Sequence, residues 1–575
     1  MYSFKVLVFL IFTTYFNPNL SEDSQSQCTG LNNCATCIQN PECAWCSQSD
    51  FHGQDKKPLP RCNSVVGHEQ LGRFQCNERY LFHHKKDKNI TRDESLSNGN
   101  SELRAVPIRP QKVSLKLRVN DPIVLQMAYK EVEDYPLDLY YLMDGTYTMS
   151  DDKEVLVGLG DSIGQRLRSL TSKFRQGFGT FVDKVTMPYV LTLEDLLENP
   201  CNRKNKTCAR PYGFKNQMPL TFNTEEFSNV VKDVILSVSS DLPEGGLDAL
   251  MQVIVCENEI GWSEQARRLI IFATDAPFHF AGDGRLGGIL LPNDGKCHMD
   301  ATGEYYTHSL MHDYPSIAQL NSKAKEHSVN IIFAVNATEI AEYKRLAKVV
   351  EGSKSTELAS NSSNIVDLVE DEYKKIKSTV EIKDSFPTEF FKVKYFSKCL
   401  GSEEMERRSC EGLQAESVVQ FRVEIELIKC LERKQEWKQR YRIYAVGVPD
   451  SIEIDVETLC DCPCENPENS RPNSPMCNNK GTEICGLCEC NTNYFGKTCE
   501  CSTDAGRLID LSTACKYENS TEICSGRGNC ICGQCTCTNS ARYTGSFCEC
   551  DNNNCLSPMS FCVLDTENVT VGMQM

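Results

Sequence analysis

The sequence predicts a multidomain chain in which a doubly wound α/β domain is inserted into a β-sandwich. Three observations predict this. Apolar strand-like runs alternate with helical patterns between residues 134 and 377. The segments on either side of this region alternate instead as β-strands. The 33 cysteines crowd toward both ends of the chain, which predicts small disulfide-stapled domains there.

The first 22 residues have the pattern of a secretory signal peptide. Lys5 precedes an apolar run of about a dozen residues, too short for a membrane-spanning helix. Cysteines begin only at Cys28, in agreement with an oxidising secretory route. Zinc binding by the CxxC spacings is the rival interpretation, which an extracellular location disfavours. Six sequons predict glycosylation: Asn89, Asn205, Asn336, Asn361, Asn519 and Asn568.

The overall charge excludes one class of partner. The chain carries 61 basic and 79 acidic residues, a net charge of −18, and it has no basic patch of the kind that nucleic acid requires. Excess carboxylate is compatible with divalent cations, although a solvated acidic surface explains most of it. No run of 18 or more apolar residues follows the signal peptide, so no transmembrane anchor is predicted in this sequence.

The cysteine-rich C-terminal region repeats itself. "CGLCEC" (485–490) recurs as "CICGQCTC" (530–537), and a "CEC" triplet follows each of them, at 499–501 and 548–550. Modules too small to bury an adequate core are stabilised by disulfides in this way. We therefore predict tandem EGF-type modules.

The middle region predicts a parallel sheet covered on both faces. Its strand-like runs are apolar on both sides and alternate with helical patterns, the arrangement of a doubly wound fold. One predicted helix opens on Thr224 as an N-cap, with glutamates in its first turn. The predicted strands cover 137–143, 177–185, 266–275 and 328–335, and the predicted helices cover 153–174 and 224–239.

The segments that flank this region, 114–131 and 380–450, alternate polar and apolar residues, as in "SVVQFRVEIEL". Such alternation is typical of antiparallel strands with one buried face. Because strand segments lie on both sides of one α/β unit, we predict that the α/β domain is inserted into a β-sandwich.

A polar motif follows the first buried strand directly. In "DGTYTMSDD", Asp144, Thr146 and Thr148 stand at alternating positions where doubly wound sheets bind ligands, the carboxyl ends of the strands. One carboxylate and two hydroxyls suit Mg²⁺, Mn²⁺ or Ca²⁺ rather than zinc. These few charges do not complete a coordination shell, so the predicted site keeps an open position.

Further carboxylates stand at matching places in the same predicted sheet. Asp275 ends a second strand, and the loop 239–250 carries Asp241 and Glu244. The alternative is structural, because Asp and Thr after a strand are ordinary N-caps and turn formers. The agreement of two strand ends and one loop favours a cation site.

Long motifs in a fixed order resemble one family. From residue 28 to 562 the chain carries a cysteine-rich N-terminal segment, "DLYYLMDGTYTMSDD", "GFGTFVDK", "PEGGLDALMQ", "GWSEQARRLIIFATDA", "DGRLGGILLPNDGKCH", "HDYPS" and EGF-type modules. In this order they resemble a divergent, invertebrate-like integrin β subunit that is truncated at its C-terminus. The resemblance implies a signal peptide (1–22), a PSI domain (26–76), a hybrid β-sandwich domain (103–133 and 378–460), an I-like, von Willebrand A-type domain (134–377), EGF-type modules (461–501 and 502–550) and an incomplete third module (551–575).

The resemblance also implies three adjacent cation sites. A central Mg²⁺ or Mn²⁺ would accept an acidic side chain of the ligand at its open position, and a Ca²⁺ would lie on either side. The central ligands would be Asp144, Thr146, Thr148 and Glu244, with Asp275 acting through water. The second site would use Asp151, Asp152, the Thr148 carbonyl and a carbonyl near Ser360. The third would use Asp183, Asp241, Glu244 and the carbonyls around Leu242 and Pro243.

The chain departs from the family pattern at three of these positions. Thr146 and Thr148 replace the usual serines, and a threonine hydroxyl still coordinates a cation. Ser239 replaces an asparagine of the third site. Its hydroxyl reaches less far, so we expect weaker calcium binding there.

Two further features match family elements. The loop from Cys201 to Cys208 matches the specificity-determining loop and carries Arg203, Lys204 and Lys206; a solvated charged hairpin is the alternative. Arg285 matches the arginine that inserts into the α subunit, although a plain surface arginine is the alternative. The family pairing of cysteines implies Cys28–Cys43, Cys37–Cys62, Cys46–Cys76, Cys34–Cys462, Cys201–Cys208, Cys256–Cys297, Cys399–Cys410 and Cys430–Cys460.

The resemblance implies a cell-surface adhesion receptor that pairs with an α subunit and binds acidic extracellular ligands. A shift of the last helix of the α/β domain (364–377) would move the sandwich and so transmit signals. A soluble decoy or matrix-binding protein is the alternative. Catalysis is not expected, because no His, Cys or Lys accompanies the metal motif. Cys550, Cys555 and Cys562 begin a module that does not finish, so we expect a truncated sequence rather than a natural secreted form.

Overall fold

The computed structural model describes residues 28–551, and it forms two compact units. Unit 1 comprises residues 1–85, 118–121 and 459–575; unit 2 comprises 86–117 and 122–458. Not described within 28–551 are residues 29, 50, 53–58, 66–67, 69–75, 100–103, 202–206, 224, 360–362, 503–514, 518–519, 532–533 and 541. The predictions that fall outside the described residues are the signal peptide, Arg203, Lys204, Asn205, Lys206, Ser360, Asn361, Asn519, Asn568 and residues 552–575 of the third module.

A six-stranded sheet forms the centre of the α/β domain in unit 2. Its strand order is β10-β9-β8-β11-β12-β13, and every pair is parallel except that of the edge strand β10 with β9. Each residue of β8, β11 and β12 is buried, as their continuous apolar sequences predict. The strands are β8 (Leu137–Asp144), β9 (Phe174–Phe181), β10 (Phe214–Thr221), β11 (Arg267–Thr274), β12 (Val329–Val335) and β13 (Ser353–Glu357).

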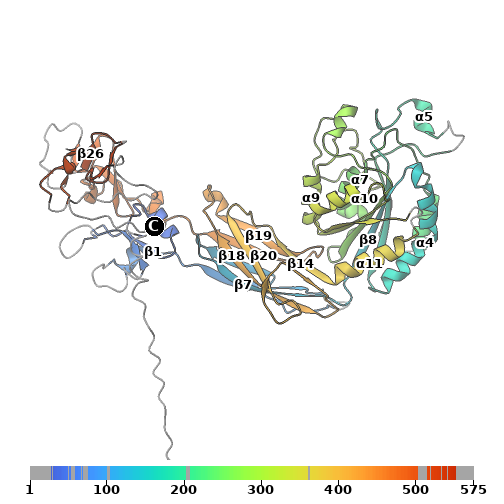
Figure 1. The fold of residues 1–575 in the computed structure, drawn as a ribbon, viewed down its shortest axis with the longest axis horizontal. Coiled ribbons are helices and arrows are strands. Elements are labelled where there is room, and N and C mark those ends of the chain that lie inside the picture. Colours follow the sequence, from blue (N-terminus) through green and yellow to red (C-terminus); the bar gives the residue numbers. More distant parts are fainter. Residues whose placement is uncertain are drawn as a thin grey trace, which may run out of the picture. The chain divides into compact units, whose positions relative to one another are not determined.

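Helices cover both faces of this sheet (Figure 1). Side chains alternate along each strand, so Tyr140 and Leu142 of β8 pack in one core cluster while Leu139 and Tyr141 pack in the other. The helices of the first cluster are α7 (Gly246–Val255), α9 (Ile317–Glu326) and α10 (Ile340–Val349); those of the second are α4 (Ser150–Arg168), α6 (Glu225–Asp233) and α11 (Ile365–Lys377). Two short helices, α5 (Glu194–Glu198) and α8 (Glu257–Ile260), complete the domain.

The predicted helix over 224–239 is too long. Helix α6 ends at Asp233, and the residues after it are not helical, with Val234 and Leu236 buried and Ile235 57% exposed. Ser237 donates its N–H to the Gly145 carbonyl at 2.8 Å, so this backbone is used to hold the loop after β8. The β-branched residues Val234 and Ile235 also favour extended backbone over helix.

The two sheets of a β-sandwich form the rest of unit 2. Their strand orders are β17-β14-β19-β20-β6-β4 and β16-β15-β18-β7-β5. The chain leaves the sandwich after β7 and returns at β14, so the α/β domain is inserted between these strands. The strands are β4 (Asp87–Arg92), β5 (Ile108–Arg109), β6 (Lys112–Leu117), β7 (Ile123–Lys130), β14 (Thr379–Asp384), β15 (Phe391–Ser397), β16 (Met405–Glu406), β17 (Ser409–Glu411), β18 (Val418–Leu427), β19 (Lys438–Ala445) and β20 (Ser451–Thr458).

The prediction of antiparallel strands throughout the sandwich is wrong for one pair. Strand β6 pairs with β20 in parallel, from Lys112 opposite Glu453 to Leu117 opposite Thr458. These strands lie on opposite sides of the insertion in sequence, so no hairpin joins them and no turn imposes an antiparallel direction.

Unit 1 contains small sheets and many disulfides. Helix α2 (Cys34–Gln39) packs against a sheet of β1 (Cys43–Cys46), β2 (Cys62–Ser64) and β3 (Leu81–Phe82). Short hairpins follow, β21 (Gly481–Ile484) with β22 (Leu487–Cys490), and β25 (Gly528–Ile531) with β26 (Gln534–Cys537). Two-residue strands pair as β23 (Tyr494–Phe495) with β24 (Cys501–Ser502) and as β27 (Tyr543–Thr544) with β28 (Cys550–Asp551).

Seven of the eight implied cysteine pairs form disulfides in the structure: Cys28–Cys43, Cys37–Cys62, Cys46–Cys76, Cys34–Cys462, Cys201–Cys208, Cys256–Cys297 and Cys399–Cys410. Cys430 and Cys460 are both disulfide-bonded. Each C-terminal module repeats three bridges, Cys464–Cys485, Cys477–Cys488 and Cys490–Cys499 in one, and Cys515–Cys530, Cys524–Cys535 and Cys537–Cys548 in the other. Cys550 is a free thiol among the described cysteines.

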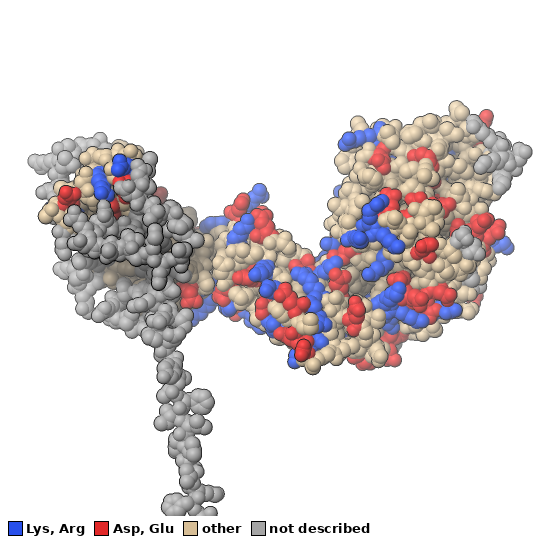
Figure 2. Space-filling model, viewed as in Figure 1, with Lys and Arg blue, Asp and Glu red and all other residues tan. Residues whose placement is uncertain are grey.

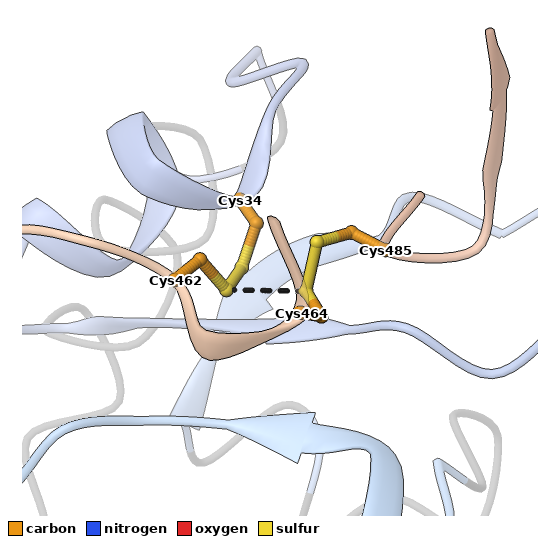
Figure 3. Close-up of side chains that lie close together, drawn as sticks. All are labelled: Cys34, Cys462, Cys464 and Cys485. Atoms are coloured by element: carbon orange, nitrogen blue, oxygen red, sulfur yellow. Dashed lines mark hydrogen bonds between the residues drawn. A yellow bond between two sulfur atoms is a disulfide. The ribbon is translucent and has the colours of Figure 1, made fainter. Parts of the chain in front are cut away.

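Two of these bridges lie against each other in the core of unit 1 (Figure 3). The Sγ atoms of Cys462 and Cys464 are 3.3 Å apart, so the bridge to Cys34 contacts the bridge to Cys485. The buried indole of Trp45 donates a hydrogen bond to the Cys485 carbonyl at 3.0 Å. The N-terminal domain and the first EGF-type module therefore share one core.

A buried charged pair joins the sandwich to the α/β domain. Arg267, at the start of β11, donates to the Glu131 carboxylate at 2.9 Å and to the Tyr129 hydroxyl at 3.0 Å, and all three side chains are buried. Glu131 directly follows β7. The network therefore fixes the point at which the chain passes from one domain into the other.

Replacing Arg267 with Met should destabilise unit 2 by about 3–5 kcal/mol, because Glu131 would keep a buried charge without its partner. Thermal unfolding of the purified chain measures this. The double variant Arg267→Met/Glu131→Gln should recover part of the loss. Arg440→Met, which breaks an exposed pair with Asp455, should cost much less. Equal losses for Arg267→Met and Arg440→Met would contradict this role.

Candidate cation site

The site begins where β8 ends. Asp144 is the last residue of this strand and is fully buried. One carboxylate oxygen accepts the N–H of Thr146 at 2.8 Å, and the other accepts the hydroxyl of Thr274 at 2.7 Å. Gly145 allows the sharp turn that follows, because a Cβ there would lie 3.0 Å from the Phe181 carbonyl oxygen. The turn holds Asp144 in one orientation at the edge of the sheet.

The hydroxyls of the motif converge as the sequence predicts. The Thr146 and Thr148 hydroxyl oxygens lie 2.9 Å apart, and the Thr148 hydroxyl donates to Asp275 at 3.1 Å. Asp275 directly follows β11, the parallel neighbour of β8. Two neighbouring strand ends therefore bring four predicted residues into one cluster.

The loop before α7 adds a third side to this cluster. Ser239 donates its hydroxyl to Glu244 at 2.5 Å. Glu244 is fixed by its backbone, which accepts from the N–H of His279 at 3.1 Å and donates to the Pro277 carbonyl at 3.0 Å. The residues after β11 therefore hold the loop that carries Glu244. Leu242 of the same loop is exposed.

A second group of carboxylates lies on the other side of Glu244. Asp183 is fully buried and accepts hydrogen bonds from the Tyr314 hydroxyl at 2.5 Å and from the Lys184 N–H at 2.6 Å. His279 Nε2 lies 3.1 Å from an Asp241 carboxylate oxygen and 3.5 Å from one of Asp183. The Ser239 hydroxyl oxygen also lies 3.3 Å from the Asp241 carbonyl oxygen. Asp183, Asp241 and Glu244 thus share one negatively charged region.

Three carboxylate oxygens in this region are buried without a hydrogen-bond partner among the described residues. They belong to Asp183 (Oδ2), Asp241 (Oδ1) and Glu244 (Oε2). A buried carboxylate without compensation is costly, and a cation bound by oxygen ligands removes that cost. The donor set, carboxylates and hydroxyls without sulfur, fits magnesium, manganese or calcium.

The pKa values of these carboxyl groups reflect the same lack of compensation for buried negative charge. Burial raises the pKa of Asp144 to about 6 and that of Asp183 to about 7. For Glu244, burial and then the nearby charge of Asp144 raise the pKa to about 11. The pKa of Asp275 is also raised, first by burial. Without added positive charge, this site holds protons at neutral pH.

Three other predicted residues lie on helix α4 and on a 3₁₀ turn. Asp151 and Asp152 occupy the first turn of α4, where the helix dipole also favours negative charge. Arg285 is exposed on a 3₁₀ turn, η4 (Asp283–Gly287). A cleft of about 370 Å³ opens onto the cluster, and its lining includes Thr146, Thr148, Cys201, Ser239, Asp241, Glu244 and Asp275.

Four contributors were missed by the sequence reasoning. His279 and Tyr314 contact Asp183, Thr274 contacts Asp144, and the side-chain amide of Asn336 donates to the Asp275 carbonyl at 3.0 Å. A simple sequence signal could have identified Thr274 and Asn336, because each stands at the carboxyl end of a central strand. No local pattern marks His279 or Tyr314, which reach the site from loops.

Comparisons with known proteins agree with this architecture. The family model for the integrin beta chain VWA domain matches residues 132–380, that for the integrin plexin domain matches 26–77, and that for the integrin EGF domain matches 509–549. The chain is 47% identical to Integrin beta-PS of Drosophila melanogaster over 78% of its own length and 54% of that protein. It thus spans about half the length of that relative.

Two other relatives match over more of their length. Integrin beta-1 of Gallus gallus is 39% identical over 93% of this chain and 68% of its own length. Integrin beta pat-3 of Caenorhabditis elegans is 40% identical over 93% of this chain and 66% of its own length. With this identity and coverage, and with the PSI, VWA-type and EGF domains in this order, the chain belongs to the integrin β family.

Proposed function

We propose that this chain is the β subunit of a heterodimeric adhesion receptor that binds acidic extracellular ligands through a divalent cation at the carboxyl edge of its α/β sheet. The observation that carries the proposal is a set of buried carboxylate oxygens that have no hydrogen-bond partner in the described part of the chain, together with two convergent hydroxyls that line an open cleft. A bound Mg²⁺ or Mn²⁺ would supply the positive charge that a carboxylate of the ligand requires.

The residues would divide among three cations. Asp144, Thr146, Thr148 and Glu244 would hold the central ion, with Asp275 next to it; Asp151 and Asp152 would serve one flanking Ca²⁺, and Asp183, Asp241 and Glu244 the other. The Ser239 hydroxyl already donates to Glu244, which supports the expectation that this last calcium binds weakly. Tyr314 and His279 would orient the carboxylates of the same site.

Pairing with an α subunit is supported by an exposed apolar surface around Arg285. Figure 2 shows basic and acidic side chains interspersed over the visible face of unit 2, so charge marks no single patch on that face. Exposed apolar side chains do mark a patch near Arg285. Leu286 and Leu290 are 71% and 73% exposed, and Leu291, Leu310 and Met311 are also exposed. Contiguous exposed apolar side chains are typical of protein interfaces.

Signalling would use the connection between α11 and the sandwich. Only Ser378 separates the last residue of α11, Lys377, from the first residue of β14, Thr379. A displacement of the helix along its axis would therefore act directly on a strand of the sandwich. A soluble decoy remains the second candidate function, and co-purification with an α subunit distinguishes the two.

Asp144→Ala should abolish cation-dependent ligand binding. The test co-expresses the chain with an α subunit and measures binding of an Asp-containing peptide in Mg²⁺ or Mn²⁺ against EDTA. Thr146→Ser, which keeps the hydroxyl, should bind as the parent does, while Thr146→Val, which keeps only the shape, should weaken binding at least about tenfold, a loss of about 1.4 kcal/mol. Undiminished binding by Asp144→Ala would rule out the cation mechanism.

Without cations, the α/β domain should become less stable as the pH rises from about 5 to about 7.5. The carboxyl groups of Asp144 and Asp183 have pKa values of about 6 and about 7 in the folded protein, against about 4 in an unfolded chain. The unfolded chain therefore releases these protons first, and folding stability falls through that range. Thermal unfolding in EDTA measures the effect.

Adding Ca²⁺ and Mg²⁺ should raise the unfolding temperature more at the higher of these two pH values, because fewer protons then compete for the carboxylates. The double variant Asp144→Asn/Asp183→Asn should reduce both the fall in stability with rising pH and the pH dependence of the cation effect. An equal cation effect at the two pH values would contradict the assignment of these carboxylates as cation ligands.

Leu290→Lys should reduce co-purification with an α subunit, since a charge would be buried in the proposed interface. Val349→Lys at the end of α10 is the matched control, because Val349 is also an exposed apolar residue but lies on another element. Pull-down of a tagged α subunit gives the measurement. Equal recovery of both variants would place the interface elsewhere.

A further inference from the structure

A histidine cluster lies outside the oxygen-lined site, in the irregular segment between η4 and α9. Three of the nine histidines of the chain fall within residues 298–312 of this segment. The ring centroids of His298 and His308 are 3.9 Å apart, those of His298 and His312 are 5.1 Å apart, and those of His308 and His312 are 5.4 Å apart. Three imidazoles are thus gathered in one place.

A carboxylate completes the cluster. Asp294 Oδ1 lies 2.9 Å from His298 Nε2 and 3.9 Å from His312 Nδ1. One ligand atom each from Asp294, His298 and His312 lie within 4.8 Å of one another. A tetrahedral zinc ion with bonds of 2.0–2.1 Å holds its ligand atoms about 3.3 Å apart, so small side-chain movements would suffice.

The buried end of the cluster contains an unpartnered ligand atom. His312 is nearly fully buried, and its Nδ1 has no hydrogen-bond partner among the described residues. Burial of such a nitrogen without a partner is costly. A metal ion between His312 and Asp294 would give this atom a ligand bond.

The backbone around the cluster is held on several sides. Lys184 is fully buried and donates from Nζ to the carbonyls of Ser309 and His312, each at 2.8 Å. The Thr307 hydroxyl donates to the His298 carbonyl at 2.7 Å. The N–H of Lys296 donates to Asp294 Oδ1 at 3.0 Å, which orients that carboxylate. Ligands held in this way lose little freedom when a metal binds.

We propose that Asp294, His298 and His312 bind one divalent transition-metal ion of the zinc class, with His308 as the nearest candidate for a fourth ligand. Imidazole nitrogen favours Zn²⁺, Cu²⁺ or Ni²⁺ over Mg²⁺ and Ca²⁺, so this site selects a different cation from the oxygen-lined one. The proposal does not rest on the proposed adhesion function.

Metal binding would stiffen the surface that carries Arg285. The metal would join residues 294 and 298 to residue 312. The next residue, Asp313, accepts the N–H groups of Gly282 and Gly284 at the start of η4, at 2.7 and 2.8 Å. A metal bound at His312 therefore acts within one residue of the contact that shapes this turn.

Cobalt titration of the full purified chain tests the proposal. After removal of metals with EDTA, Co²⁺ is added in excess Mg²⁺, which occupies oxygen-ligand sites, and visible absorption is recorded. One saturable band that Zn²⁺ displaces is expected. His298→Gln and His312→Gln should each weaken Co²⁺ binding by more than about tenfold, the loss that follows removal of even an outer partner of a ligand.

Two controls separate this site from others. Two variants outside the cluster should leave the cobalt band unchanged. Asp144→Ala alters the oxygen-lined site, and His327→Ala removes a histidine that pairs with Glu257. Absence of a saturable band, or a band that persists in both His298→Gln and His312→Gln, would overturn the proposal.

A measurement on the unmodified sequence covers the case in which the variants do not fold. Diethyl pyrocarbonate modifies accessible histidines, and mass spectrometry locates the modified residues. Zn²⁺ should protect His298, which is partly exposed, and leave exposed His52 reactive. Equal modification of His298 with and without Zn²⁺ would also overturn the proposal.

Discussion

The burial of several carboxylates side by side is the constraint on which the rest of the α/β domain depends. Asp144, Asp183 and Glu244 are buried at one edge of the sheet, and burial raises the pKa of each. Such a cluster stabilises nothing by itself, because each charge loses water and opposes its neighbours. Hydrogen bonds from Thr274, Thr146, Ser239 and Tyr314 restrain these carboxylates, yet one oxygen of Asp183 and one of Glu244 have no hydrogen-bond partner among the described residues. The scaffold thus maintains a site that favours a ligand of opposite charge.

The parts of this site that follow a strand were predictable from sequence. Continuous apolar runs identify β8, β11 and β12, and the carboxyl ends of parallel strands meet at one edge, so Asp144, Thr146, Thr148 and Asp275 could be grouped without coordinates. The fold of the inserted domain followed from the same alternation. The placement of cations at these residues stays a prediction.

Other features required tertiary information. Helix α6 stops at Asp233 because the backbone of Ser237 bonds to Gly145, a contact between segments about ninety residues apart. The parallel pairing of β6 with β20 depends on which strands become neighbours after the insertion, and periodicity within a strand contains no such information. His279 and Tyr314 reach Asp183 from separate loops, and their own neighbours in sequence give no sign of it.

The parallel pairing of β6 with β20 has a consequence for the order of events during synthesis. Val113 lies opposite Ile454, and the whole α/β domain is translated between them. The α/β sheet, whose strands all lie within residues 137–357, can form on the ribosome while β6 still lacks β20 and β7 still lacks β18. Until β18 and β20 emerge, β7 and β6 each have one open side, so a chaperone that shields these strands would act in that interval. Sandwich assembly is thus the late, non-local step, and folding defects in this chain should concentrate there rather than at the cation site.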